Sequence, residues 1–278
     1  MPKTRSGPLA NCLTNSFARE GGELLFQSAG VQPRAITPRE SLVLLHAASY
    51  TRSMWLPQIY ALQNDFRILA PDLPGHGALA NQKFTFDAAT ETVLAAMAQA
   101  GMDRALFVGV SLGGMVAMQI AAQCPGSVAG LILSGCTFDP CGLLCQLILT
   151  AEGVVFPRGA ARWTRNLERY LTARYPAPMA EEMMAGGTYW QAAADAVRAM
   201  RGVHFAGQLA RYPGPSLILN GAQDWIHRSA EGLYSRAAQK ATVQVIPNAG
   251  HVANLDQPEA FTQAVRAFAK AINYTTQG

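Results

Sequence analysis

Ser111 stands in the middle of a long stretch of the chain that carries no charged side chain. The stretch runs from position 105 to position 138 and includes ALFVGVSLGGMVAMQ, residues 105–119. Within it, GVSLG at residues 109–113 fits the pattern G-x-S-x-G. This pattern needs a tight turn from a strand into a helix, and glycines two residues before and after the serine avoid collisions across that turn. The pattern predicts that Ser111 is a nucleophile.

Two other interpretations of this stretch compete with the nucleophile. A membrane span needs about 20 consecutive apolar residues, but glycines at 109, 113 and 114 and a Pro-Gly pair at 125–126 interrupt the run. A buried strand over 105–110 and a helix over 115–122 fit the residue types better. This strand and helix are the context that the serine pattern requires, and no membrane span is predicted.

A serine nucleophile needs a base, and the chain has five histidines, at positions 46, 76, 204, 227 and 251. His251 lies in the loop PNAGHVANLDQPEAF, which follows an expected strand near the C-terminus. We therefore predict that His251 is the base. His46 and His76 are expected to support loops, and no pattern indicates a function for His204 or His227.

The base needs a carboxylate that holds its tautomer. Asp224, in LILNGAQDWIH, follows an expected strand and sits between Ser111 and His251 in chain order. The order serine, aspartate, histidine favours Asp224 as the third member of a triad. Asp139 is the alternative acid, because it also follows a strand, whereas Asp72 precedes the serine.

Strands alternate with helices on both sides of one long interruption. Strands are expected at 41–45, 66–70, 105–110, 128–133, 215–219 and 242–246, and helices at 84–100, 113–124, 229–239 and 258–272. This alternation predicts a mostly parallel central sheet with helices on both faces. We expect a loose tail at 1–15, a core at 16–136 and 213–278 that begins with a hairpin over 17–27, and a helical lid at 137–212.

Composition limits the classes of function that the chain can have. Of its 278 residues, 50% are hydrophobic and only 14% are charged, and the net charge is +4. No Lys/Arg cluster is dense enough for nucleic-acid binding. The five cysteines form no zinc pattern with a histidine, so they are expected to be small buried side chains and no metal is predicted. The first 16 residues lack the apolar core of a secretory signal, which predicts a cytoplasmic protein.

Four motifs together resemble the α/β-hydrolase superfamily, in particular its lid-bearing esterases and lipase-like members. They are GVSLGG at the turn, LLHAASYTRSMW after the first strand, APDLPGHG at 70–77, and the pair NGAQD and NAGHVANLDQPEAF. The resemblance covers residues 17–136 and 212–273. It implies an α/β-hydrolase fold and an oxyanion hole formed by the backbone N–H groups of Leu112 and Ala48. One departure is Ala47, which stands where the superfamily most often has glycine and is expected to tighten the pocket against esters of bulky tertiary alcohols.

The function predicted from these features is that of a serine hydrolase without a cofactor. It would cleave an ester, thioester, lactone or amide of a small to medium hydrophobic molecule, with Trp225 and Val252 as candidate pocket walls. A hydrolase of C–C bonds and a cofactor-free perhydrolase or haloperoxidase remain alternatives on the same triad. A ligand receptor that keeps the fold is the alternative from another class. The partner is a small-molecule substrate, and no oligomeric state is predicted.

Overall fold

A computed structural model describes residues 40–274, together with every side chain in that range except that of Leu144. The expected tail at 1–15 and the hairpin at 17–27 lie outside the described residues. Six strands form one sheet in the order β2-β1-β3-β4-β5-β6, and every neighbouring pair is parallel. The strands are β1 (Ser41–Leu45), β2 (Arg67–Leu69), β3 (Ala105–Val110), β4 (Val128–Ser134), β5 (Pro215–Gly221) and β6 (Lys240–Ile246).

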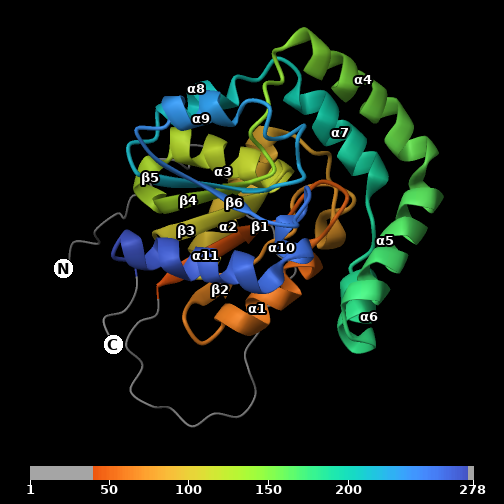
Figure 1. The fold of residues 1–278 in the computed structure, drawn as a ribbon, viewed down its shortest axis with the longest axis horizontal. Coiled ribbons are helices and arrows are strands. Elements are labelled where there is room, and N and C mark those ends of the chain that lie inside the picture. The colour runs from red at the N-terminus through yellow and green to blue at the C-terminus, as the bar shows by residue number, and fades with distance from the viewer. Residues whose placement is uncertain (1–39, 275–278) are drawn as a thin grey trace, which may run out of the picture.

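Helices cover both faces of this sheet, as predicted (Figure 1). One face carries α2 (Phe86–Gln99), α3 (Leu112–Gln123), α8 (Phe205–Ala210) and α9 (Glu231–Ala237). The other carries α1 (Leu56–Leu62) and α11 (Pro258–Ala271). Short helices occur at η2 (Arg52–Trp55), η3 (Gly77–Leu79), η4 (Pro125–Ser127) and α10 (Ala253–Asp256).

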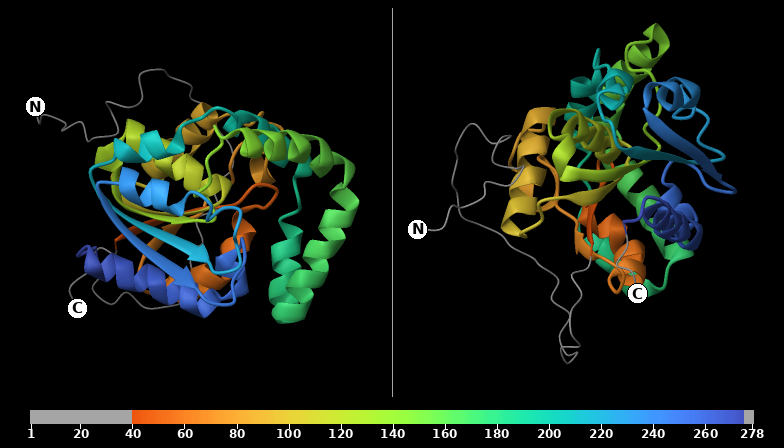
Figure 2. Two further views of the ribbon diagram at one scale, coloured as in Figure 1. Left: turned by 45° about the horizontal axis from the view of Figure 1, so that its top comes forward. Right: turned by 90° about the vertical axis from the view of Figure 1, so that its left-hand side faces the viewer.

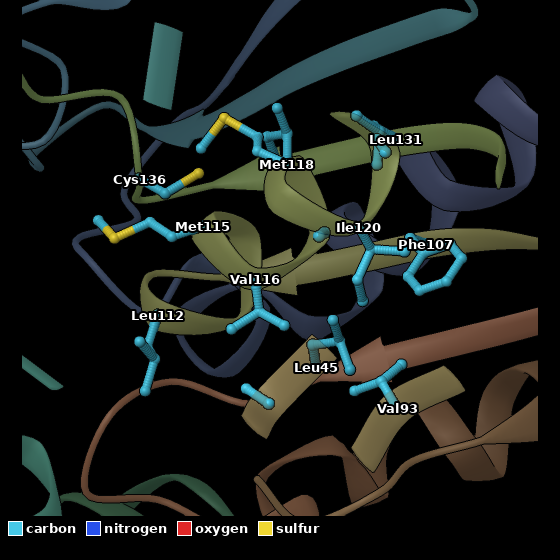
Figure 3. Packing of buried hydrophobic residues seen from close by; sticks show 14 of the residues in the cluster. Leu45, Val93, Phe107, Leu112, Met115, Val116, Met118, Ile120, Leu131 and Cys136 are labelled. Atoms are coloured by element: carbon cyan, nitrogen blue, oxygen red, sulfur yellow. The ribbon is translucent and has the colours of Figure 1, made fainter. Parts of the chain in front are cut away.

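Alternate residues of the central strands enter two separate hydrophobic clusters. Val43 and Phe107 pack with the helices of the first face, whereas Leu42 and Leu106 pack with those of the second. Helix α3 carries no charged side chain, and its residues Leu112 to Ala121, which include one polar residue, Gln119, are all buried. Figure 3 shows its side chains packed between the sheet and the neighbouring elements. This burial explains why the stretch around Ser111 carries no charge.

The segment between β4 and β5 is helical, in agreement with the absence of a strand pattern there. It contains α4 (Leu143–Arg158), α5 (Ala160–Arg174), α6 (Ala177–Ala185) and α7 (Trp190–Met200), followed by α8. Helices α4 to α7 extend beyond the end of the sheet (Figures 1 and 2). Helix α8 instead packs against α3, and Phe205 and Leu209 belong to the cluster of the first face.

Among the described residues, no helix combines the length and the apolar character that crossing a membrane requires.

Candidate active site

The turn between β3 and α3 places Ser111 in a backbone conformation that only a constrained turn supports. Its φ is 53° and its ψ is −116°, a region that residues with a side chain rarely adopt. Its backbone N–H donates to the carbonyl of Ser134, at the end of β4, over 2.8 Å. The turn is therefore tied to the neighbouring strand, and the side chain of Ser111 lies at the carboxyl edge of the sheet.

The glycines around this turn are required by space. A Cβ atom at Gly109 would lie 2.4 Å from the backbone of Gly113, and one at Gly113 would lie 2.0 Å from the carbonyl oxygen of Leu45. A Cβ atom at Gly114 would lie 2.5 Å from the sulfur of Cys136. The predicted steric role of these glycines agrees with these distances, and the close approach brings the start of α3 against the end of β1.

Two backbone N–H groups next to this contact are left without a partner. Within residues 40–274, the N–H of Leu112 and the N–H of Ala48 donate no hydrogen bond. Leu112 is fully buried and Ala48 is half-buried. Buried N–H groups are nearly always paired, so two free donors are unusual. An oxyanion hole needs free donors of this kind, and the assignment of Leu112 and Ala48 to it stays a prediction.

The loop that carries Ala48 is held by two buried histidines. His46 accepts a hydrogen bond at Nε2 from the N–H of Leu73 over 2.9 Å, and Nε2 of His76 accepts one from Ser49 over 3.3 Å. Burial and the neighbouring His76 lower the pKa of His46 to about 3, so that it stays neutral. Both side chains support loops, as expected, and neither is positioned as a base.

Asp224 and His251 come together at the same edge of the sheet. Asp224 follows β5, His251 follows β6, and Oδ2 of Asp224 lies 2.9 Å from Nδ1 of His251. Burial alone would raise the pKa of Asp224, but hydrogen bonds from His227 and His251 outweigh it and hold the pKa well below its usual range. Asp224 is therefore an ionised acceptor for an imidazole N–H.

The end of β5 at Gly221 packs against the loop that carries His251. Only glycine fits there, since a Cβ atom at position 221 would lie 2.2 Å from the carbonyl oxygen of Gly250.

The last residue of β4 and the residue that follows it contact Ser111 and His251, respectively. Ser134 accepts the N–H of Ser111, and the next residue, Gly135, lies so close to His251 that a Cβ atom would be 2.9 Å from Nδ1. The hydroxyl of Ser111 makes no hydrogen bond to another described residue, His251 included. The structure thus joins Asp224 to His251 and places Ser111 beside the same segment without a direct bond to the imidazole.

The alternative acid, Asp139, has another partner. Its Oδ1 accepts the backbone N–H of Cys141 over 3.0 Å, just before α4 begins. It makes no hydrogen bond to His251. This hydrogen bond lies in the turn before Gly142, the N-cap of α4, so Asp139 does not cap the helix.

His227 occupies a place in the site that no sequence pattern indicated. Its Nδ1 lies 2.8 Å from Oδ1 of Asp224, and its ring stacks on His251 with centroids 3.9 Å apart. The signal available in the sequence was its position three residues after Asp224. The absence of a predicted role for His227 is therefore corrected.

Glu152 is the other residue that sequence analysis missed. It is the only acidic residue in α4, is half-buried, and interacts electrostatically with His251. Burial raises its pKa, against the lowering effect of His251. A single carboxylate in a mostly apolar helix was the signal in the sequence.

The two candidate wall residues differ in environment. Trp225 is 77% exposed, and Val252 is half-buried at the start of α10. Neither position by itself defines a pocket wall, so both assignments stay predictions. Asp224, His227 and His251 could also hold a metal ion, because their donor atoms lie within 4.8 Å of one another. In the structure these atoms are engaged in hydrogen bonds to each other.

The comparisons with known proteins agree with this architecture. Residues 42–264 match the Alpha/beta hydrolase family. The chain is 30% identical over 255 residues to a pimeloyl-[acyl-carrier protein] methyl ester esterase of Pectobacterium carotovorum, covering 83% of this chain and 94% of the esterase. It is 25% identical over 240 residues to 3-oxoadipate enol-lactonase 1 of Acinetobacter baylyi, covering 84% and 89% of the two chains.

Solved structures show the same fold. A thermophilic esterase from Thermogutta terrifontis superimposes with a TM-score of 0.71 at 24% identity, covering 84% of this chain and 91% of that one. Together with the family match over most of the described residues, this similarity assigns the fold that the serine turn and the parallel sheet indicated. The chain belongs to the Alpha/beta hydrolase family.

Proposed function

We propose that the protein is a serine hydrolase that cleaves a carboxylic ester or a related acyl bond, such as a thioester, lactone or amide. The observation that carries the proposal is Ser111 at a positive-φ turn beside two unpartnered backbone N–H groups. The Asp224–His251 pair at the same sheet edge supplies the base that such a serine needs. The esterase and lactonase among the relatives act on bonds of this class.

The reaction follows from the roles of these groups. His251 takes the proton of the Ser111 hydroxyl at Nε2 while the serine oxygen attacks the acyl carbon. The N–H groups of Leu112 and Ala48 stabilise the oxyanion that forms. His251 then returns the proton to the leaving alcohol, which leaves an acyl group on Ser111. Water, activated by the same histidine, releases the acid and restores the serine.

Asp224 acts on the base rather than on the substrate. It accepts the Nδ1–H of His251, so the lone pair needed for catalysis is at Nε2. It also stabilises the imidazolium that forms while the proton is held. Its low pKa keeps it ionised through this step.

We propose that α4 to α7 form a lid that lines the binding pocket and sets substrate size. A hollow between this segment and the loop after β1 is lined by Tyr50, Met54, Leu167, Leu171, Met183 and Leu255. These side chains are mostly apolar, and Tyr50 and Met54 belong to the loop region that also carries Ala48. Thr51, Ser53 and Gly187 complete the lining, and the hollow is no larger than about one water molecule. We propose that an acyl chain extends into it where the lining side chains make room, as they would in Met183→Ala.

A series of p-nitrophenyl esters of increasing acyl length tests both proposals. We expect turnover of short and medium chains. In Met183→Ala the preference should move to longer chains, by about fourfold in kcat/KM for each additional methylene that the enlarged hollow buries. The ratio between two substrates is the readout, because it does not depend on the fraction of folded enzyme.

Leu233→Ala is the matched control, since Leu233 is 42% exposed on α9, far from the hollow in the fold. The lid proposal is contradicted if Met183→Ala and Leu233→Ala keep the same chain-length preference. Absence of turnover with every ester, thioester, lactone and amide tested would contradict the hydrolase proposal and favour a ligand receptor.

A further inference from the structure

Asp224 is shared by two histidines, one more than a triad requires. Its Oδ2 faces Nδ1 of His251 at 2.9 Å, and its Oδ1 faces Nδ1 of His227 at 2.8 Å. The backbone N–H of His227 lies 3.4 Å from the same Oδ1. Both carboxylate oxygens are therefore engaged by imidazole groups, and the carboxylate has no freedom to rotate without losing one of them.

The ring of His227 contacts two other rings. His251 stacks on one side, with the ring planes 28° apart, and the ring of Phe138 meets it at 88° with centroids 5.3 Å apart. The backbone carbonyl of His227 accepts the hydroxyl of Thr137 over 2.7 Å. These contacts connect His227 to the end of β4 and restrict its ring to the orientation that faces Asp224.

The environment of His227 favours its neutral form. Its side chain is 23% exposed, and burial and the nearby His251 lower its pKa against the raising effect of Asp224. A neutral imidazole has one N–H, and the short contact with an ionised carboxylate places that proton on Nδ1. His227 is then a permanent hydrogen-bond donor to the acid and does not compete for its proton.

We propose that His227 is a positioning residue that orients Asp224 toward His251 and withdraws part of its negative charge. This inference deepens the proposed function and rests on it. The donor on Oδ1 fixes Oδ2 against Nδ1 of His251, and the stacked ring fixes the plane of the base. Without the donor, Asp224 would carry more charge toward His251 and hold it less accurately.

Three other titratable groups interact with this cluster. Glu152 faces His251 from α4. Cys136, after β4, and Arg228, in the loop after β5, both interact electrostatically with Asp224. Burial raises the pKa of the Cys136 thiol well above its usual range, so the thiol stays neutral. Glu231 is held by Arg228 and Asn220. Of these groups, Glu152 interacts with His251 rather than with Asp224.

Two variants separate the effect of the hydrogen-bond donor of His227 from the effect of its ring. In His227→Asn the amide N–H can replace Nδ1–H, whereas His227→Phe keeps a ring between Phe138 and His251 but has no donor. We expect His227→Phe to lower kcat by about 10- to 100-fold, the size of one hydrogen bond to a charged group, with KM within about threefold. As the pH is lowered, kcat/KM of His227→Phe should begin to fall at a higher pH than that of the wild type. Without the hydrogen bond from His227, the full negative charge of Asp224 stabilises protonated His251.

His227→Asn should recover most of the kcat and most of the wild-type pH profile. Glu152→Gln should shift the pH profile in the opposite direction to His227→Phe. It removes a carboxylate that interacts with His251, so the pH at which kcat/KM falls on acidification should be lower than in the wild type. The inference is wrong if His227→Phe has a wild-type kcat and pH profile, or if the asparagine and phenylalanine variants are equally impaired with no shift.

A measurement on the unmodified protein guards against variants that do not fold. Nitrogen NMR of the ¹⁵N-histidine-labelled enzyme should show His227 as the neutral Nδ1–H tautomer at pH 7, and an Nε2–H tautomer would overturn the inference. Ser111→Ala in the same assays separates this inference from the proposed function. Full activity in Ser111→Ala removes the proposed function. An inactive Ser111→Ala beside a normal His227→Phe removes only the role of His227.

Discussion

Replacing Ser111 by alanine is expected to lower kcat by about 10⁴-fold or more while leaving the protein folded. The substitution removes one hydroxyl that makes no hydrogen bond to a described residue. The hydrogen bond from the backbone N–H of residue 111 to Ser134 is unaffected by it. Stability should therefore change little, whereas the atom that attacks the acyl carbon is lost. Steady-state hydrolysis of a p-nitrophenyl ester and a thermal melt measure the two effects.

Ser216→Ala is the matched control for this experiment. Ser216 is a buried serine on β5 whose hydroxyl also has no partner, and its strand lies in the same sheet. We expect its kcat to stay within about threefold of wild type, the size of a change in which no transition-state contact is lost. A Ser111→Ala enzyme that turns over at the rate of Ser216→Ala would contradict the serine mechanism.

The second large effect is expected at Asp224. Asp224→Asn replaces an ionised acceptor by a neutral amide, and the amide can donate to Nδ1 and place the proton of His251 on the wrong nitrogen. By this tautomer effect kcat should fall by about 10⁴-fold. Asp224→Asn also removes the negative charge that His227 contacts. The decrease in its kcat should therefore be at least as large as that of any single His227 variant.

Asp139→Asn is the discriminating comparison, because Asp139 also follows a strand and was the alternative acid. Its carboxylate accepts the N–H of Cys141, and an asparagine oxygen can still accept that hydrogen bond. We expect a loss under about 10-fold in kcat, since no reacting group is touched. Both variants should be assayed at the same pH. A severe loss at Asp139 with a near-normal Asp224→Asn would move the acid to the end of β4.

The sheet and the serine turn could be predicted because their causes are local in the sequence. Buried parallel strands such as β3 need continuous apolar runs, and the turn after it needs glycine at positions 109 and 113. The strands were predicted to within two residues at each end. The chain order of Ser111, Asp224 and His251 likewise selects residues that all follow strands at one sheet edge.

The parts that were missed depend on contacts between distant segments. Asp224 and His227 lie in an irregular loop, so their spacing of three residues has no fixed geometry until Phe138 and His251 pack against it. Glu152 interacts electrostatically with His251 only because of the path that α4 takes after β4. The same reason applies to α8, which lies within the expected lid at 137–212 but packs on α3.

The most direct test of the central claim is to locate the acyl or phosphonyl group on the enzyme. The protein would be treated with a fluorophosphonate, digested, and examined by peptide mass spectrometry, with Ser111→Ala treated in parallel. We predict one stoichiometric adduct on the peptide that contains Ser111, no adduct in Ser111→Ala, and loss of ester turnover in proportion to labelling. An adduct on another residue with full loss of turnover, or complete labelling of Ser111 with turnover unchanged, would contradict the account.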